Sequence, residues 1–319
     1  MNCSKLFLIQ YNTTNIVNFA RMNKGILYII VSGLSFLVVN FFVKILGAGP
    51  EQELFPGTQK YPGHELVLFR SIVSFAISLY IIKRRNLPVL GNNKKWLLIR
   101  GVSGMIALTI FFYSIHHLPL AIASTVQYLA PIFTVIFALL ILKERVAKLQ
   151  WFFILIAFIG VAMIGLNNLF TSDKYAGIDY TWFGLGIISS AFSGIAYTAI
   201  IRLKTTDTPI NIVLYFPMIS IPIMSFWCLF DFTFPNGIEW IFLLLLGIFT
   251  QIAQVLLTKA LHEESAAIIT PFQYLGAIYA AILGYFIFDE RLSWIVYSGI
   301  GLILTGIIAN ALLKKVHDK

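Results

Sequence analysis

Apolar runs of about twenty residues recur along the chain and constrain its fold more than any other feature. As a helix, a run of this length spans the roughly 30 Å hydrocarbon core of a bilayer. Charged residues make up only 12% of the chain and the mean hydropathy is +0.85, whereas about a quarter of a soluble domain is charged. The sequence therefore predicts an all-α integral membrane protein. We expect ten transmembrane helices, at residues 25–46, 65–82, 97–115, 118–142, 149–168, 182–202, 210–230, 238–260, 266–288 and 294–313.

Lysine and arginine are distributed unequally between the connections of these helices. Most of the 23 Lys and Arg residues, including the run KRRNLPVLGNNKK at 83–95, fall on the side that would hold both termini. Cytoplasmic loops of membrane proteins carry an excess of these residues. The pattern predicts a multi-pass protein of the cell (plasma or inner) membrane with both termini in the cytoplasm. The net charge of +9 is then a topology signal and does not indicate nucleic acid as a partner.

The first 24 residues are polar and mixed, and no small-residue cleavage site follows an apolar core. We expect a cytoplasmic N-terminal tail over residues 1–24 and a short cytoplasmic tail over 314–319. Met22 would also make a plausible start, so whether residues 1–21 belong to the native chain stays open.

One segment that begins with two polar residues occurs twice in this apolar chain. QYLAPIFTVIFALLILKER occupies residues 127–145 and QYLGAIYAAILGYFIFDER occupies 273–291. The offset of 146 positions that relates them also takes Ser74 onto Ser220 and Gly160 onto Gly306. Chance similarity between Leu/Ile-rich helices would explain the apolar matches but not the shared Gln-Tyr-Leu and Glu-Arg. The pattern indicates an internal duplication.

Five helices in each half have a geometric consequence. Because five is odd, the second half enters the membrane from the opposite side, and the two repeats are inverted. We expect a first repeat at 25–168, a linker at 169–181 and a second repeat at 182–313. Inverted repeats are a common architecture of secondary transporters, with the substrate site near the membrane midplane. The sequence therefore favours alternating-access transport over catalysis.

The stretch LPLAIASTVQYLAPIFTVIFALLILKERVAKLQWFFILIAFIGVAMIG at 118–165 resembles the EamA repeat of the drug/metabolite transporter superfamily. The second copy, 238–313, resembles it too but carries Ala277 where the first has Pro131. The likeness covers about 25–313. It implies ten helices and secondary-active transport of a small organic metabolite: an amino-acid-like, nucleoside-like or flavin-like solute, or a drug. It does not identify the solute.

Two polar pairs lie near the middle of their spans: Gln127 with Tyr128, and Gln273 with Tyr274. An amide without a partner in hydrocarbon costs several kcal/mol, so each Gln must face a partner or a wet cavity. A structural alternative is that each Gln bonds a neighbouring helix. Their equivalent places in the two repeats favour a shared substrate-binding cavity.

Arg70 is the other main candidate for binding the solute. An ionisable residue inside a span usually faces a cavity, and a guanidinium can hold a carboxylate or phosphate. Two alternatives stay open: Arg70 snorkels to the outer interface, or it pairs with Glu65. A spacing of five places those two on different helix faces. Asn40 and Ser74 are further polar residues expected at the site.

Other polar residues give weaker signals. Glu144 and Glu290 end their spans beside arginines and indicate a structural role at connections. His116 and His262 lie near span ends without convergent ligands, so no metal site and no cofactor are expected. The expected partners are a small-molecule substrate and the lipid bilayer. A coupling proton or an exchanged solute, and a homodimer, stay open.

Two functions of other classes compete with transport. Gly101-Val102-Ser103-Gly104 matches the G-x-S-G pattern of rhomboid-type intramembrane serine proteases, but a nucleophilic Ser needs a base within reach. The histidines lie in loops, tails or span ends, and a duplicated fold has no role in a single-nucleophile protease. A passive channel would need rings of charges or carbonyls along a pore, and the interior is sparsely polar.

Overall fold

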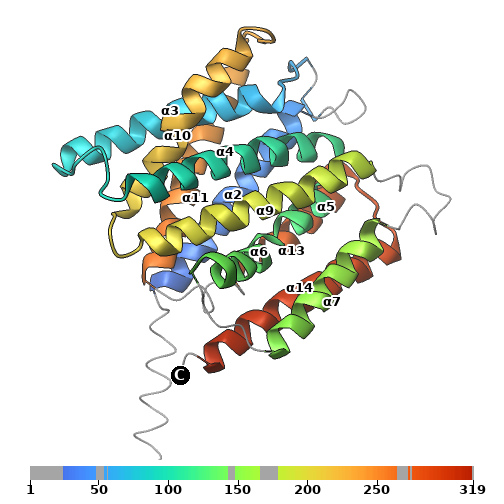
Figure 1. The fold of residues 1–319 in the computed structure, drawn as a ribbon. Coiled ribbons are helices and arrows are strands. Elements are labelled where there is room, and N and C mark those ends of the chain that lie inside the picture. Colours follow the sequence, from blue (N-terminus) through green and yellow to red (C-terminus); the bar gives the residue numbers. More distant parts are fainter. Residues whose placement is uncertain are drawn as a thin grey trace, which may run out of the picture.

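The computed structural model describes residues 24–47, 54–55, 57–142, 148–165, 179–263, 272–273 and 275–317, all of them helical or in connections. Glu144 and Tyr274 lie outside the described residues. The helices shown in Figure 1 are α2 Lys24–Gly47, α3 Gly63–Arg84, α4 Lys94–His117, α5 Leu120–Gln127, α6 Ala130–Phe137, the π-helical turn η2 Ala138–Leu142, α7 Lys148–Gly165, α9 Tyr180–Leu203, α10 Pro209–Cys228, α11 Glu239–Glu263, α13 Leu275–Phe288 and α14 Trp294–His317.

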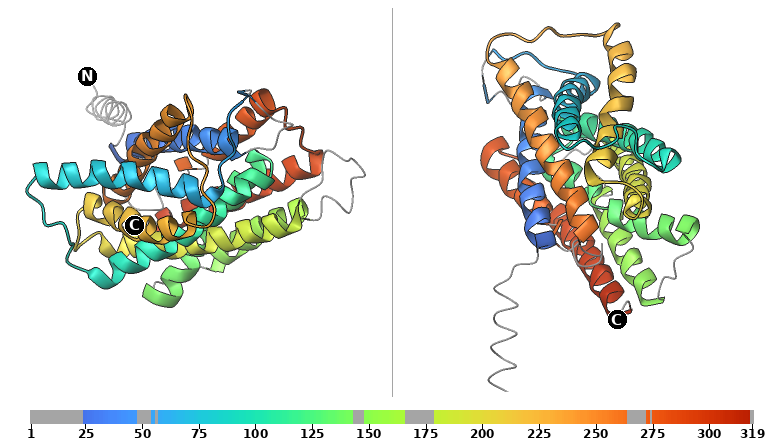
Figure 2. Two further views of the ribbon diagram at one scale, coloured as in Figure 1. Left: turned by 90° about the horizontal axis from the view of Figure 1, so that it is seen from above. Right: turned by 90° about the vertical axis from the view of Figure 1, so that its left-hand side faces the viewer.

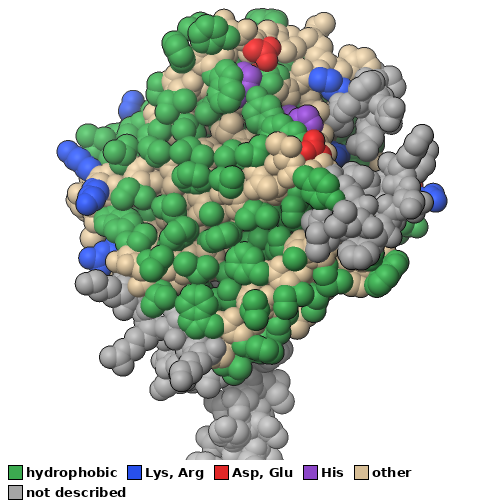
Figure 3. All heavy atoms as spheres, turned by 45° about the vertical axis from the view of Figure 1, so that its right-hand side comes forward, with side chains coloured by type: hydrophobic (Ala, Val, Ile, Leu, Met, Phe, Trp, Pro, Cys, Tyr) green, Lys and Arg blue, Asp and Glu red, His purple; other side chains and the backbone are tan. Residues whose placement is uncertain are grey.

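The helices confirm the predicted all-α membrane class. Seven stretches of the described chain are long and apolar enough to cross a bilayer, and three shorter apolar helices occupy the remaining predicted spans, at 151–164, 278–288 and 294–306. The face in Figure 3 is covered mostly by apolar side chains, with charged groups towards its edges. Large apolar residues such as Phe226, Phe286 and Trp294 are exposed on the isolated chain, as expected where lipid is the solvent.

The predicted helix over 118–142 is not continuous, which corrects the sequence interpretation. It divides at Tyr128–Leu129 into α5 and α6. Pro131 explains the break, because its nitrogen has no proton to give to the carbonyl four residues earlier, that of Gln127. Irregular backbone inside a membrane is tolerated where protein or a cavity covers it.

The packing of the helices follows the internal duplication. Helix α2 packs on α11, and its equivalent α9 packs on α4, the equivalent of α11. Helix α3 packs on its own equivalent α10, and α7 on its equivalent α14. Figures 1 and 2 show α2 beside α11 and α7 beside α14. The two halves are therefore held together by equivalent surfaces, as a two-fold relation requires.

Individual contacts repeat the same symmetry. The Ser32 hydroxyl of α2 donates to the carbonyl of Ala253 in α11 at 2.8 Å, and the Ser189 hydroxyl of α9 lies 2.7 Å from the carbonyl of Ala107 in α4. Ala107 and Ala253 are related by the offset of 146. Small hydroxyl residues let helix backbones approach and bond in the absence of water.

Glycines place α7 and α14 in direct backbone contact. A Cβ on Gly160 would lie 2.6 Å from the carbonyl oxygen of Gly299, and a Cβ on Gly306 would lie 2.6 Å from that of Phe153. These two contacts are again related by the offset of 146. Only glycine permits this approach at either position.

Buried acids fasten the loops at the two ends of the bundle. Asp207 accepts from the backbone N–H groups of Asn92 and Asn93 at 2.5 and 3.2 Å, on the face where α2 begins and α14 ends. On the opposite face, Glu239 accepts from the Tyr61 hydroxyl and the Gln59 backbone N–H, each at 2.5 Å. The offset of 146 takes Asn93 onto Glu239 and Tyr61 onto Asp207. The same pair of positions is therefore joined on both faces, by a backbone N–H donor on one face and by a side-chain hydroxyl donor on the other.

We predict that Gly160→Val lowers the stability of the folded protein, because the added side chain must separate α7 from α14. Overpacking of this kind costs about 1–3 kcal/mol. Thermal unfolding in detergent should show a lower midpoint than wild type, and Gly306→Val should behave similarly. Gly301→Val is the matched control, because a Cβ on Gly301 meets nothing within 4 Å. Equal midpoints for the Gly160 and Gly301 variants would contradict the close contact.

Candidate functional site

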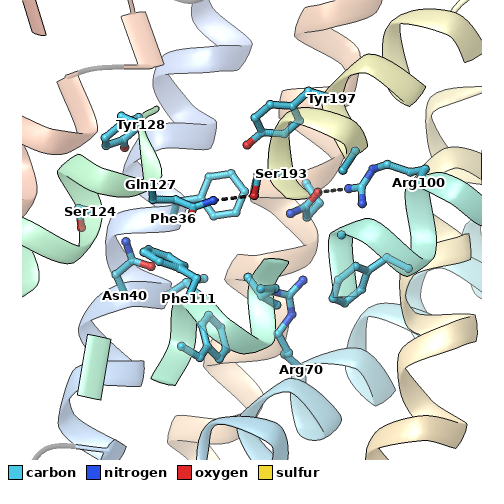
Figure 4. A pocket seen from close by; sticks show the side chains of 17 residues that line it. Phe36, Asn40, Arg70, Arg100, Phe111, Ser124, Gln127, Tyr128, Ser193 and Tyr197 are labelled. Atoms are coloured by element: carbon cyan, nitrogen blue, oxygen red, sulfur yellow. Dashed lines mark hydrogen bonds between the residues drawn. The ribbon is translucent and has the colours of Figure 1, made fainter. Parts of the chain in front are cut away.

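A cavity of about 120 Å³ lies in the middle of the bundle, between the two halves (Figure 4). Helices α2, α3, α4 and α5 of the first half and α9, α10 and α11 of the second supply its walls. Its polar and charged lining residues are Asn40, Arg70, Arg100, Ser124, Gln127, Tyr128, Ser193, Tyr197 and Gln254. Its apolar walls are largely aromatic, with Phe36, Phe111, Phe112 and Phe216. The arrangement suits an organic molecule that is partly apolar and partly polar.

The break between α5 and α6 presents Gln127 to this cavity. Its amide nitrogen donates to the Ser193 hydroxyl at 2.6 Å, and its amide oxygen lies 2.9 Å from the Ser189 hydroxyl. Both serines belong to α9, in the other half of the chain. Gln127 therefore joins the halves and lines the cavity at once, which combines the two interpretations that the sequence left open.

Arg70 enters the cavity from α3 and is almost completely buried, with 1% of its surface exposed. Its guanidinium lies over the ring of Phe216 at 4.7 Å and that of Phe112 at 5.8 Å. Nε and Nη1 have no hydrogen-bond partner. Glu65 instead accepts from the backbone N–H of Thr233 at 3.1 Å. The structure thus places Arg70 at the cavity and away from both Glu65 and the surface.

A second buried arginine, Arg100 of α4, lines the same cavity. Its Nη2 donates to the amide oxygen of Gln254 at 3.0 Å, and its Nε has no partner. Arg100 falls inside the predicted span 97–115 but was not among the predicted site residues. The signal was available, because the rule that singled out Arg70 applies equally to any charge within a span.

A smaller cavity of about 60 Å³ adjoins the first. The two share Phe36, Gln127, Tyr128 and Tyr197. The smaller one continues to Ile29, Ser32, Gly33, Leu257 and Gln273, towards the face where α2 begins. Gln273 therefore lies beside the main cavity, near its repeat equivalent Gln127.

The predicted site residues are only partly brought together. Asn40, Arg70, Gln127 and Tyr128 line the main cavity, and Gln273 lines the adjoining one. Ser74 does not line either cavity: it bonds the side chain of Gln251, which also donates to Ser78 at 2.8 Å, so it fastens α3 to α11. Tyr274 lies outside the described residues. Ser124, Ser193 and Tyr197 were not predicted, since serines and tyrosines are too frequent in these helices to stand out.

A buried ion pair closes the bundle on the face opposite the chain ends. The Lys44 ammonium lies 3.2 Å from the Glu290 carboxylate and donates to the carbonyl of Leu118 at 2.9 Å. The same carboxylate accepts from the backbone N–H of Leu120 at 2.7 Å. The sequence predicted a structural role for Glu290 at a connection beside Arg291, and these contacts support that role, although Glu290 is buried and Arg291 pairs with Asp289.

This ion pair and its hydrogen bonds connect three parts of the chain that lie between the cavity and the face opposite the chain ends. They are the end of α2, the start of α5 and the connection between α13 and α14. Ser124, one helical turn after Leu120, already lines the cavity. We call Lys44, Glu290 and Leu120 the closing contact.

Other chemistry has no comparable site within the described residues. No group of three or more His, Cys, Asp or Glu side chains there could hold a metal. The Ser103 hydroxyl donates to the carbonyl of Ile99 in its own helix at 2.6 Å, which is an ordinary helical contact and not the arrangement of an activated nucleophile.

An all-α membrane protein of two inverted halves, with a polar cavity between them, belongs to the inverted-repeat class of transporters. Family comparison identifies the group. The EamA-like transporter family matches residues 23–166 and again 180–312, so the chain belongs to this family. Transport, rather than an enzymatic reaction, is the activity of that family.

Individual relatives are similar over most of their length. The pseudopaline exporter CntI of Pseudomonas aeruginosa is 29% identical over 299 residues, covering 92% of this chain and 98% of the exporter. The S-adenosylmethionine uptake transporter of Rickettsia felis is 26% identical over 232 residues, covering 71% and 75%. A solved crystal structure with 17% identity and a TM-score of 0.62 covers 91% of this chain and 98% of its own, which shows the shared fold.

We predict that Glu290→Gln loosens the face that the closing contact holds shut. Breaking one partner of a buried ion pair costs about 3–5 kcal/mol, so transient opening should become at least about tenfold more frequent. The readout is the rate at which Ser124→Cys, in a chain whose Cys3 and Cys228 are replaced by Ser, reacts with an impermeant thiosulfonate applied at that face of sealed vesicles.

Asp289→Asn is the matched control for this experiment. Asp289 is the acid next to Glu290 in the sequence, but its carboxylate is exposed and, among the described residues, pairs with exposed Arg291. Labelling at the wild-type rate in Asp289→Asn and faster labelling in Glu290→Gln are expected. Equal rates in both variants would show that Glu290 does not hold this face closed.

Proposed function

We propose that this protein is a secondary-active transporter that moves a small organic metabolite across the membrane by alternating access. One observation carries the proposal: the main cavity lies between the two inverted halves, and both halves contribute to its wall. Rocking one half against the other would then expose the same cavity first to one side and then to the other. The repeats that rock are 25–168 and 182–313, an assignment that the two family matches support.

The two ends of the cavity differ, which supports the same mechanism. The closing contact and a buried layer that includes Leu46, Leu66 and Ile115 lie towards the face opposite the chain ends. The adjoining cavity extends the other way, towards the start of α2. Alternating access requires that the cavity be blocked towards one face of the membrane and not towards the other. The inverted symmetry of the halves allows the blocked side to be exchanged.

Sidedness follows from the charge distribution. The face that bears the chain ends also bears most of the Lys and Arg residues, which favours the cytoplasm. We therefore place the chain in the plasma or inner membrane with both termini inside. In this state the cavity would extend towards the cytoplasm.

The kind of solute is supported by the cavity and by the relatives. Aromatic walls with a few fixed polar groups suit an organic molecule. One relative is named as an exporter of pseudopaline and another as an uptake transporter of S-adenosylmethionine, which supports a small organic metabolite and leaves the direction open. A gradient or an exchanged solute would drive the movement.

We predict that Gln127→Leu reduces transport at least tenfold without preventing insertion or folding, because it removes the amide that contacts both the cavity and α9. Proteoliposomes loaded with an unlabelled mixture of amino acids, nucleosides, flavins and organic acids would be incubated with the same mixture in isotopically labelled form, and the labelled solutes inside them measured by mass spectrometry. At least one solute should enter wild-type vesicles faster than Gln127→Leu vesicles.

Thr305→Val is the control, because within the described chain the Thr305 hydroxyl donates to the carbonyl of Gly301 in its own helix α14, away from the cavity. It also replaces a polar group with an apolar one inside a span. The proposed site would be wrong if Gln127→Leu transported at the rate of Thr305→Val. The transporter assignment itself would fail if no solute entered any vesicle above the protein-free rate.

A further inference from the structure

The cavity contains two positive charges and no negative one. Arg70 and Arg100 are 1% and 3% exposed, and none of the seventeen residues that line the cavity is acidic. Within the described chain, ion pairs join Lys44 to Glu290 and Arg291 to Asp289. Neither Arg70 nor Arg100 takes part in an ion pair there. An arginine side chain does not lose its proton under ordinary conditions. Both cations are therefore buried without a counter-charge from the part of the chain that the structure describes.

The protein compensates these charges only in part. Arg70 rests against the rings of Phe216 and Phe112, and such contacts give about 0.5–2 kcal/mol. Arg100 has one hydrogen bond, to the amide of Gln254. The cost of taking an unpaired ion out of water is several kcal/mol. Neutral neighbours do not offset that cost for either guanidinium, so an external anion is the partner that the site lacks.

The two arginines approach the cavity from different faces of the membrane. Arg70 is in the second turn of α3, which begins on the face opposite the chain ends, and Arg100 is in the second turn of α4, which begins on the other face. At about 1.5 Å per residue, each Cα lies about 10 Å inside its own face. The two guanidiniums come from different helices and offer two donor forks, one for each of two acidic groups.

The rest of the lining is suited to the body of the same molecule. In Figure 4 the two arginines stand on one side of the cavity, and Asn40, Ser124 and Gln127 on the other. The Ser124 hydroxyl is buried without a hydrogen-bond partner. Aromatic rings complete the wall between them. An acidic solute could thus direct its charged groups to α3 and α4 and its remaining polar groups to α2 and α5.

We propose that the transported solute is an organic anion with two separated carboxylate groups, one held by Arg70 and the other by Arg100. This inference rests on the proposed transport function and names the substrate class of its cavity. A guanidinium binds a carboxylate through two parallel hydrogen bonds. Two such pairs would make the loaded cavity electrically neutral. An ammonium group on the solute would find no carboxylate in the lining.

Binding to purified wild-type protein in detergent tests the charge requirement. The probes are the dicarboxylates malonate, succinate, glutarate and adipate, with butyrate, succinamide, glycerol phosphate and 1,4-diaminobutane for comparison, measured by calorimetry and thermal shift. At least one dicarboxylate should bind at least tenfold more tightly than butyrate and glycerol phosphate. Glutamate, which adds an ammonium group to glutarate, should bind no more tightly than glutarate. Preferred binding of the diamine, the diamide or the phosphate would overturn the proposal.

Variants test the two arginines separately. Arg70→Gln and Arg100→Gln should each weaken dicarboxylate binding at least tenfold, because each removes one charged pair, and should leave butyrate binding less affected. Arg70→Lys keeps the charge without the fork and should recover part of the loss. Arg291→Gln is the matched control, because Arg291 is exposed and pairs with Asp289 outside the cavity. Wild-type dicarboxylate affinity in both cavity variants would overturn the assignment.

Transport by the same proteins separates this inference from the function on which it rests. If proteoliposomes carry a neutral or cationic solute in a Gln127-dependent manner and dicarboxylates do not bind, the transporter stands and the dicarboxylate assignment falls. If dicarboxylates bind through both arginines but no solute crosses the vesicle membrane, the proposed transport fails while the binding site stands. Exchange of a labelled dicarboxylate that is lost in Arg70→Gln and Arg100→Gln would support both.

Discussion

The absence of water from the hydrocarbon core requires every polar group in a span to find its partner within the chain. Many polar groups of the described spans meet this requirement, and some of their contacts occur at equivalent places in the two halves. Ser32 bonds to the backbone of α11 and Ser189 to that of α4, so one kind of contact fastens each half to the other. Ser74 and Gln251 fasten α3 to α11 in the same manner. Arg70, Arg100 and Ser124 at the cavity keep buried polar atoms without a hydrogen-bond partner, and so do Ser71 and Thr250 outside it. Two buried positive charges outside the ion pairs of the described chain, and not unsatisfied polar atoms alone, distinguish the site from its scaffold.

Symmetry governs the scaffold but not the lining of the site. Glycine contacts, hydroxyl contacts and helix pairs occur in equivalent places in both halves. The offset of 146 takes Arg70 onto Phe216 and Arg100 onto Leu246, however, so both cavity charges come from the first half. Equivalent surfaces between the halves suit a movement that reverses the access of the cavity. Side chains of the cavity that differ between the two halves can recognise a solute that itself lacks two-fold symmetry.

Much of the fold could be predicted from the sequence because membrane helices are defined by length and apolarity, which are local properties. Arg70 and Gln127 stood out for the same reason: a polar group in a span is conspicuous. The break at Tyr128 was missed even though Pro131 was noted, because a proline in a span can either kink or divide a helix. Ser74 was misplaced, and the pairing of Glu290 with Lys44 was not predicted, because both depend on which helices are neighbours, and periodicity within one helix does not contain that information.

The charge of the cavity also bears on how movement could be coupled. With no solute bound, two guanidiniums that are already almost completely buried must stay without a counter-charge while the site closes and opens to the other side, so the cost of their unpaired burial persists through that step. A dicarboxylate removes this cost by neutralising both. Closure of the loaded cavity would then be easier than closure of the empty one, and each half-cycle would require a bound anion. Under this argument, obligatory exchange of one anion for another follows from Arg70 and Arg100 themselves, without a separate proton-binding acid in the cavity.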